Sequence, residues 1–238
     1  MLLDNSDDTK KVYKWIETYT EDGTFDAVTG YFTIGVLAYL SKKVNDKISE
    51  FRLVLGDIAS RNDKDFKALD LLNEDISNES AFRLSKTAEE AVNFLKQDKV
   101  FAKTLEPNFC HAKLYLHESH FDKQRNNYYV TGSSNLTEAG IGLEHTSNAE
   151  LNIADHGSNL QYNELRDWFD HLWNNKALND KTIDKGKKIN FKKYLINEIS
   201  TIFHKYTPND IYFKILAELI AEPFSEELIH QKMKDTEI

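Results

Sequence analysis

The sequence predicts a layered α/β fold in which a mixed β-sheet is flanked by helices and followed by a C-terminal helical extension. Short segments rich in strand formers alternate with segments whose apolar residues recur at helical spacing. Four strand-like segments follow one another in quick order in the middle of the chain. Beyond Asn159 the periodicity is helical only. Strands interleaved with helices are typical of a layered α/β architecture.

The N-terminal half supplies the alternating elements. A helix is predicted over residues 8–20, because Val12, Trp15, Ile16 and Tyr19 recur at helical spacing. Asp63 or Asp65 is expected to cap a further helix that ends near Asn73. The remaining elements predicted here are strands over residues 25–32 and 51–58 and helices over residues 35–44 and 87–97.

The second half begins with strands and ends with helices. Strands are predicted over residues 100–105, 111–117, 128–133 and 150–154. Amphipathic helices are predicted from Leu160 to Trp173, from Phe191 to Phe203 and after Pro208. A lysine-rich segment after Asn175 marks the expected boundary between a catalytic domain, residues 1–175, and a helical extension or linker, residues 176–238.

Composition narrows the class of protein. A chain of 238 residues with 40% hydrophobic residues is long enough and apolar enough to bury a substantial core. The single cysteine, Cys110, excludes an internal disulfide and fits a reducing compartment. No apolar run is long enough to span a bilayer, so we expect a cytoplasmic protein without a membrane partner.

One group of residues suits chemistry better than packing. Side chains alternate along an extended segment, so His111, Lys113 and Tyr115 share one face of the strand predicted at 111–117. An imidazole beside a fixed ammonium group suits attack on a phosphate, because His can act as nucleophile or general acid while Lys neutralises the phosphoryl oxygens. The segment Gly132-Ser133-Ser134-Asn135 ends the next predicted strand, although these residue types also form plain turns.

These residues resemble the signature of the phospholipase D superfamily, which is His-x-Lys, four residues, Asp, and then Gly-Ser-x-Asn. His111 and Lys113 match its first part, and residues 132–135 match its second part. Glu118 stands where the signature has Asp, and residues 119–131 make a longer hairpin than the short form of the signature. Alternation places Glu118 off the face of His111, which favours a structural role for it. The resemblance implies a phospholipase D-like sheet flanked by helices.

The resemblance also implies a mechanism. His111 would attack phosphorus and form a phosphohistidine, which splits one displacement into two easier ones. Lys113 and Asn135 would hold phosphoryl oxygens, and Ser133 would add a hydroxyl donor. Glu150 would accept a hydrogen bond from the other ring nitrogen of His111, although it could equally belong to the polar face of an edge strand. This scheme needs no divalent metal and no other cofactor.

A second imidazole has to protonate the leaving oxygen, yet the chain contains one His-x-Lys. Superfamily members with a single copy form twofold dimers in which the two motifs face each other. The resemblance therefore implies a homodimer with a shared active site.

Two further stretches are similar to the branch of this superfamily that contains small bacterial nucleases, metal-independent restriction endonucleases and nuclease-like domains in front of helicase-related proteins. Thr29-Gly30-Tyr31-Phe32 is similar to the first strand of that branch, and Gly142-Leu143 with Asn148-Ala149-Glu150 resembles the stretch after Gly-Ser-x-Asn. Residues 208–219 are similar to the segment that joins such a domain to a helicase motor, which would lie beyond Ile238. We therefore expect a nuclease that cleaves nucleic acid, with DNA as the substrate, in a restriction or defence system.

Charge distribution bears on this interpretation. The net charge of −9 is unusual for a nucleic-acid enzyme, but residues 176–193 carry seven lysines against two aspartates, a net +5. This stretch is either a solvated linker or a contact to the phosphate backbone, with Lys185, Lys187 and Lys188 as candidate substrate-binding residues. Tyr31 is the candidate to stack against substrate, and its alternative is a core residue.

Other function classes remain open. A non-catalytic module that dimerises and holds DNA for a helicase would use the same surface without cleavage. A lipid-cleaving enzyme is disfavoured, because no basic amphipathic helix with exposed aromatic residues is evident. A zinc site formed by His111, His117 and His120 is disfavoured too, because no Cys or acidic pair completes a tetrahedral set.

Overall fold

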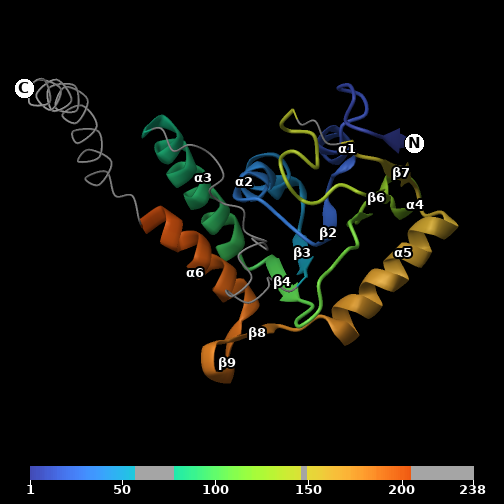
Figure 1. The fold of residues 1–238 in the computed structure, drawn as a ribbon. Coiled ribbons are helices and arrows are strands. Elements are labelled where there is room, and N and C mark those ends of the chain that lie inside the picture. The colour runs from blue at the N-terminus through green and yellow to red at the C-terminus, as the bar shows by residue number, and fades with distance from the viewer. Residues whose placement is uncertain (57–77, 146–148, 205–238) are drawn as a thin grey trace, which may run out of the picture.

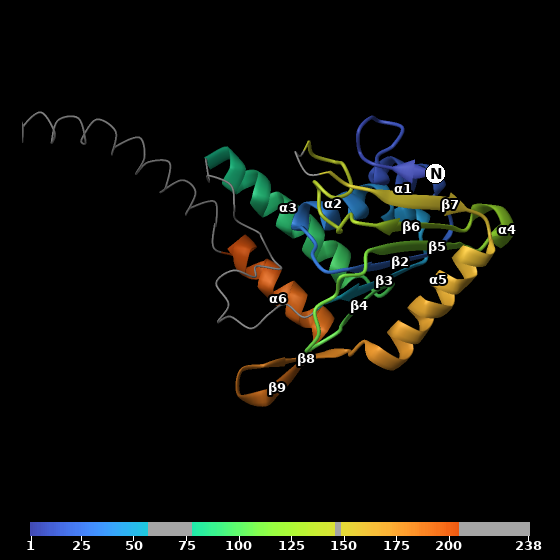
Figure 2. The same cartoon turned by 45° about the vertical axis from the view of Figure 1, so that its right-hand side comes forward.

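The computed structural model describes residues 1–56, 78–145 and 149–204. A seven-stranded sheet lies between helices on its two faces, as Figures 1 and 2 show from two directions. The predicted fold class, a mixed sheet flanked by helices, is therefore confirmed. The helix predicted between Asp63 and Asn73 lies outside the described residues.

The sheet is mixed and joins strands from distant parts of the chain. In spatial order its strands are β1 (Leu2–Leu3), β7 (Asn152–His156), β6 (Tyr128–Gly132), β5 (Leu114–Ser119), β2 (Gly23–Thr29), β3 (Glu50–Leu55) and β4 (Val100–Thr104). Strands β2, β3 and β4 run parallel, and every other neighbouring pair is antiparallel. The short edge strand β1 was not predicted, and β5 begins three residues later than expected.

One face of the sheet carries the larger hydrophobic cluster. Four helices cover it: α1 (Val12–Tyr19), α2 (Ile34–Lys43), α3 (Asn78–Lys96) and α6 (Phe191–His204). Their apolar sides pack against alternate strand residues, among them Phe25, Leu53 and Tyr115. The helices predicted at 8–20, 35–44, 87–97 and 191–203 are confirmed, with α3 starting earlier than its periodicity indicated.

The opposite face carries a second cluster under helix α5 (Leu160–His171) and the π-helical turn η2 (Leu172–Lys176). Leu114 and Leu116 of β5 point to this face, whereas Tyr115 between them points to the first. Strand β5 is thus buried on both sides, as the alternation of its side chains requires.

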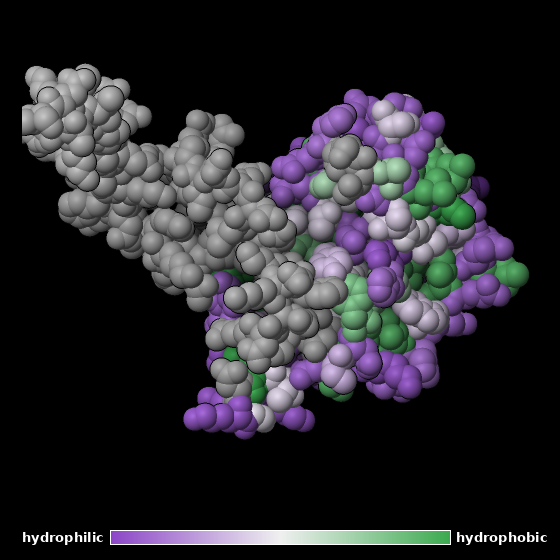
Figure 3. Space-filling model, in the orientation of Figure 1, coloured by the Kyte–Doolittle hydropathy of each residue, from purple (hydrophilic) through white to green (hydrophobic). Residues whose placement is uncertain are grey.

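Apolar side chains are exposed at the edge of the sheet that β1 and β7 form, on the face that α5 covers elsewhere. Leu2 and Ile153 lie opposite each other in the register of the two strands and are 57% and 54% exposed, and Leu151 is 60% exposed. Figure 3 shows green apolar side chains gathered at its upper right, where Figure 1 places β7. Most of the remaining described surface in that view is hydrophilic.

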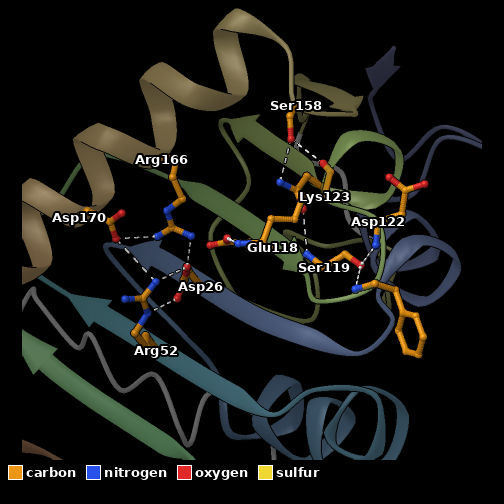
Figure 4. A network of polar contacts seen from close by, with 11 residues as sticks. Asp26, Arg52, Glu118, Ser119, Asp122, Lys123, Ser158, Arg166 and Asp170 are labelled. Atoms are coloured by element: carbon orange, nitrogen blue, oxygen red, sulfur yellow. Dashed lines mark hydrogen bonds and ion pairs between the residues drawn. The ribbon is translucent and has the colours of Figure 1, made fainter.

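Buried ion pairs fasten α5 to the sheet (Figure 4). Asp26 of β2 is fully buried, and its carboxylate accepts from Arg52 Nε at 2.6 Å, from Arg52 Nη2 at 2.8 Å and from Arg166 Nη1 at 2.5 Å. Arg166 also donates to Asp170 one helical turn further along α5. A buried carboxylate needs such partners because desolvation of an unpaired charge is costly. The ion pairs therefore stabilise the fold, and no catalytic role is needed to explain the network.

Glu118 takes part in local structure at the far end of β5. Its carboxylate pairs with Lys123 of the short helix α4 (Lys123–Asn126), which lies in the connection between β5 and β6. Its side chain projects from the face opposite to that of Tyr115, and Figure 4 shows it beside the α5 network.

The C-terminal region differs from the all-helical pattern expected beyond Asn159. A hairpin of β8 (Asp180–Ile183) and β9 (Lys187–Asn190), joined by the short turn η3 (Asp184–Gly186), separates α5 and η2 from α6. The alternation in this lysine-rich segment is too polar to be recognised as strand. Helix α6 contributes Phe191, Leu195 and Ile199 to the main cluster. The helix predicted after Pro208 lies outside the described residues.

Candidate active site

The predicted catalytic residues flank strand ends at one edge of the sheet. Val28 pairs with Leu114, Leu114 pairs with Thr131, and Gly132 pairs with Asn152. The end of β2, the start of β5, the end of β6 and the start of β7 therefore lie side by side. His111 and Lys113 precede β5, Ser133 and Asn135 follow β6, and Glu150 precedes β7.

The backbone that carries His111 is held against this edge by two glycines. A Cβ atom added at Gly30, after β2, would overlap the carbonyl oxygen of Cys110, and one added at Gly56, after β3, would overlap the Cys110 amide nitrogen. Cys110 itself is buried, and burial raises the pKa of its thiol. Cys110 is therefore a small packing residue, and the position of its backbone fixes where His111 begins.

His111 and Lys113 lie in a loop, not inside the strand predicted for them. Strand pairing begins only after Lys113, whose carbonyl oxygen accepts from the Thr131 hydroxyl at 2.9 Å and the Gly132 amide at 3.4 Å. His111 is exposed, and the Lys113 ammonium donates to the His111 carbonyl at 2.7 Å. The Lys113 ammonium is therefore held beside the backbone of His111, and this contact does not depend on the strand geometry that suggested their pairing.

The carboxylate of Glu150 contacts serine hydroxyls. Its Oε2 atom accepts a short hydrogen bond from Ser133 and a longer one, of 3.4 Å, from Ser134. Leu151 donates its amide to the Ser133 hydroxyl at 2.9 Å. Within the residues that the structure describes, the partners of Glu150 are thus the two serines, whereas the family resemblance implied His111.

Below this contact lies a buried polar layer. The Tyr115 hydroxyl donates to the Ser134 carbonyl at 2.8 Å, and the Asn152 amide group donates to the Ser134 hydroxyl at 2.8 Å. Burial, followed by the nearby charge of Glu150, raises the pKa of Tyr115 well above its usual value. Tyr115 therefore stays protonated and holds the turn after β6 in place.

Asn135 is tied to the end of β2. The buried hydroxyl of Thr29 lies 3.2 Å from Asn135 Oδ1, and it accepts from the Leu136 amide at 3.1 Å. Phe32 and Leu136 then pair across an isolated bridge. The Thr-Gly-Tyr-Phe and Gly-Ser-Ser-Asn segments are thus neighbours. Sequence reasoning did not assign Thr29 this contact, because nothing local links residues 29 and 135.

The candidate substrate-binding residues occupy two places. Tyr31 is partly buried, with its ring centroid 5.3 Å from that of Phe109. Lys185, Lys187 and Lys188 are exposed on the hairpin β8–β9.

That hairpin is attached to the loop that leads to His111. Leu178 exchanges backbone hydrogen bonds of 2.7 and 3.0 Å with Thr104 at the end of β4. Thr182 of β8 donates its amide to Glu106 Oε2 at 2.7 Å. The lysine-rich hairpin therefore extends from the same end of β4 from which the chain continues to His111.

The described residues contain no group of three or more His, Cys, Asp or Glu side chains that could hold a metal ion. Nδ1 of buried His117 lies 3.1 Å from the Thr24 carbonyl, and its Nε2 accepts from the Glu21 amide at 3.5 Å.

Among the described helices, none has the length and apolar character needed to cross a bilayer.

No protein-family model and no curated protein matches the chain. Among solved structures, it is similar to Nuc from Salmonella typhimurium, a phospholipase D family member, with a TM-score of 0.45, 10% identity and coverage of 80% of this chain and 97% of that one. It is also similar to phosphatidylserine synthase from Haemophilus influenzae Rd KW20, with a TM-score of 0.47 and 14% identity. That likeness covers 96% of this chain, which spans less than half, 46%, of the synthase chain. Both likenesses concern the fold alone.

Proposed function

We propose that this protein is a metal-independent phosphodiesterase that cleaves nucleic acid, with DNA as the substrate, through a phosphohistidine on His111. The proposal rests on one observation above all. Residues that are far apart in sequence, and that suit phosphate chemistry, flank neighbouring strand ends at one edge of the sheet. Packing does not require this set there, because His111 and Ser133 are exposed.

Each side chain has a role in the proposed reaction. The imidazole of His111 attacks phosphorus and forms a P–N bond while the P–O bond to the leaving oxygen breaks and the imidazole of a second copy protonates that oxygen. Water then gives a proton to that second imidazole and breaks the P–N bond. Lys113 and Asn135 stabilise charge on the phosphoryl oxygens, since donors aimed at developing charge lower the barrier. The Ser133 hydroxyl donates to Glu150 and accepts from the Leu151 amide, so it would add a donor to a phosphoryl oxygen by turning from Glu150 to the substrate.

A nucleic acid is favoured over a small phosphodiester by the hairpin. The exposed Lys185, Lys187 and Lys188 extend from the segment attached to the His111 loop, and they locally offset the acidic surface of the chain. Lysines of this kind bind backbone phosphates without reading sequence.

We further propose that two copies share the active site. The chain supplies one His-x-Lys, while displacement needs both a nucleophile and a proton donor to the leaving oxygen. Exposed Leu2, Leu151 and Ile153 lie on β1 and at the start of β7, next to Glu150 and Ser133, and a second copy would cover them. A restriction or defence role alongside a helicase partner fits such a nuclease.

The alternative is a non-catalytic module that holds DNA and dimerises for a helicase-like partner. Such a module would bind DNA through the hairpin β8–β9 and would dimerise through the exposed Leu2, Leu151 and Ile153. His111 would then have no catalytic role. The acidic net charge favours weak DNA binding that a partner assists.

Strand cleavage in excess EDTA tests the proposal. We expect the wild type to cut DNA, His111→Ala to lose activity by at least about 1,000-fold because the nucleophile is removed, and His120→Ala, an exposed histidine on the β5–β6 connection, to keep it. A radiolabelled protein adduct that is stable to alkali and labile to acid should form only when His111 is present. Cleavage abolished by EDTA would defeat the metal-free scheme, and DNA binding without cleavage would favour the alternative.

A further inference from the structure

We propose that Phe109 is a positioning residue for His111, whose imidazole it holds at the angle needed for attack on phosphorus. This inference rests on the proposed function, because it deepens the role of the nucleophile. It assigns a task to a residue that the sequence motifs leave out, and it gives His111 an orienting partner other than Glu150.

The main chain around His111 is fixed on both sides. Cys110 is held between Gly30 and Gly56, where no side chain larger than hydrogen fits. On the other side, Lys113 is tied to β6 through its carbonyl oxygen and to the His111 carbonyl through its ammonium group. These contacts therefore fix the position of the His111 Cα atom. Only the rotation of the His111 side chain then remains to be restricted.

A ring contact restricts that rotation. The imidazole lies against Phe109 with a centroid distance of 4.7 Å and an interplanar angle of 73°, an edge-on arrangement. Aromatic rings favour this geometry because the positive edge of one ring meets the negative face of the other. Within the described part of the chain, the imidazole of His111 forms no hydrogen bond to a protein group, so Phe109 is the contact that sets its orientation.

Phe109 is itself supported by the sheet. Its ring lies 5.3 Å from that of Tyr31, whose carbonyl oxygen accepts from the buried Thr29 hydroxyl at 2.6 Å. A path of contacts thus runs from the end of β2 through Tyr31 and Phe109 to the imidazole. Tyr31 would then act mainly as a support for Phe109, which is a different task from stacking on substrate.

The first test reads the imidazole directly and needs no activity. The side-chain NMR signals of the eight histidines are recorded, and those of His111 are assigned from their loss in His111→Gln. The ring current of a phenyl group displaces the signals of nearby protons, in one direction beside its face and in the other beside its edge. We expect Phe109→Leu to remove this displacement at His111, Phe109→Tyr to keep it, and Phe121→Leu, a loss of a phenylalanine that is 83% exposed, to leave it alone.

The second test is kinetic. Phe109→Leu should lower kcat by roughly 3- to 10-fold with little change in KM, because one aromatic contact is lost and substrate binding is retained. Phe109→Tyr should restore kcat, and Phe121→Leu should match the wild type. If Phe109 only stabilised the fold, Phe109→Leu would instead shift the NMR signals of the other histidines, and Phe109→Tyr would not restore kcat.

Unchanged His111 signals and unchanged kcat in Phe109→Leu would overturn the proposal, as would a change confined to KM. A wild type without cleavage would overturn the proposed function only, because the imidazole signals still decide whether Phe109 orients His111.

Discussion

Gly30 illustrates how a single residue can set the geometry of the candidate site. It lies in the Thr-Gly-Tyr-Phe segment, and the structure explains why glycine is needed there. The carbonyl of Cys110 passes so close that a methyl group would displace it. Since His111 is the residue after Cys110, the position of the proposed nucleophile depends on the absence of a side chain just after β2, far away in the sequence.

We therefore expect Gly30→Ala to impair both stability and cleavage. Overpacking against backbone costs about 1–3 kcal/mol, and a displaced nucleophile should lower kcat by about 100-fold. Urea unfolding and DNA cleavage measure the two effects. The control is Gly35→Ala, whose new methyl group would meet the movable end of the Glu138 side chain. Equal activity of the two variants would contradict the role assigned to Gly30.

A second residue, His117, links stability to pH. It is fully buried, and desolvation lowers its pKa from 6.5 to about 4, against the opposing effect of the Thr24 carbonyl. Between these pH values the unfolded chain takes up a proton that the folded protein does not. Stability should consequently fall as pH drops from about 6.5 to about 4, by up to about 3 kcal/mol from this residue.

Urea unfolding at several pH values tests this expectation. His117→Gln should lose the part of the pH dependence that lies between pH 6.5 and 4, because glutamine does not titrate. His171→Gln, at an exposed position at the end of α5, should retain it. If His117→Gln and the wild type show the same slope in this interval, another group is responsible.

At the scale of the elements, loop and strand ends matter more than strand interiors. Alternation along β5 buries Leu114, Tyr115 and Leu116 between the two helical layers, so this strand is a rigid support. The proposed catalytic residues all lie just outside β5, β6 and β7, where side chains are free to face a substrate. This arrangement separates stability, which the strands supply, from chemistry at their ends.

The hairpin β8–β9 is the element most suited to phosphate contacts. Replacing Lys185, Lys187 and Lys188 by glutamine should weaken DNA binding and reduce the salt dependence of the logarithm of the binding constant by about 1 for each lysine that contacts a phosphate. Fluorescence anisotropy over a range of salt concentrations measures this slope. The matched control replaces Lys14, Lys42 and Lys43, exposed lysines of α1 and α2, and should leave the slope unchanged. An equal loss in both triple variants would indicate a general charge effect.

At the scale of the whole molecule, the number of active sites depends on assembly. A shared site makes a mixed dimer of wild-type and His111→Ala chains inactive, since each phosphodiester needs both imidazoles. Activity of co-expressed mixtures should therefore follow the square of the wild-type fraction, with about one quarter remaining at equal amounts. Light scattering should give about twice the chain mass of 27.6 kDa. Activity proportional to the wild-type fraction, or a monomeric mass, would contradict the shared site.

Local patterns were sufficient for most of the framework. Helical periodicity identified α1, α2, α5 and α6, and runs of strand-forming residues identified the central strands, because buried faces leave a trace in the local residue types. The two-residue strand β1 and the lysine-rich hairpin β8–β9 escaped this reasoning. The first is too short to show a pattern, and the second is too polar.

The sequence by itself determined that His111, Lys113, Ser133 and Asn135 suit phosphate chemistry and that a mixed sheet would carry them. Only the tertiary structure decided that His111 precedes its strand, that Glu150 meets Ser133 and Ser134, and that Phe109 touches the imidazole. Side-chain type and spacing are local properties and can be read along the chain. The partner that a side chain finds depends on strand order and on backbone approach between distant segments, as at Gly30 and Cys110, and neither leaves a local signal.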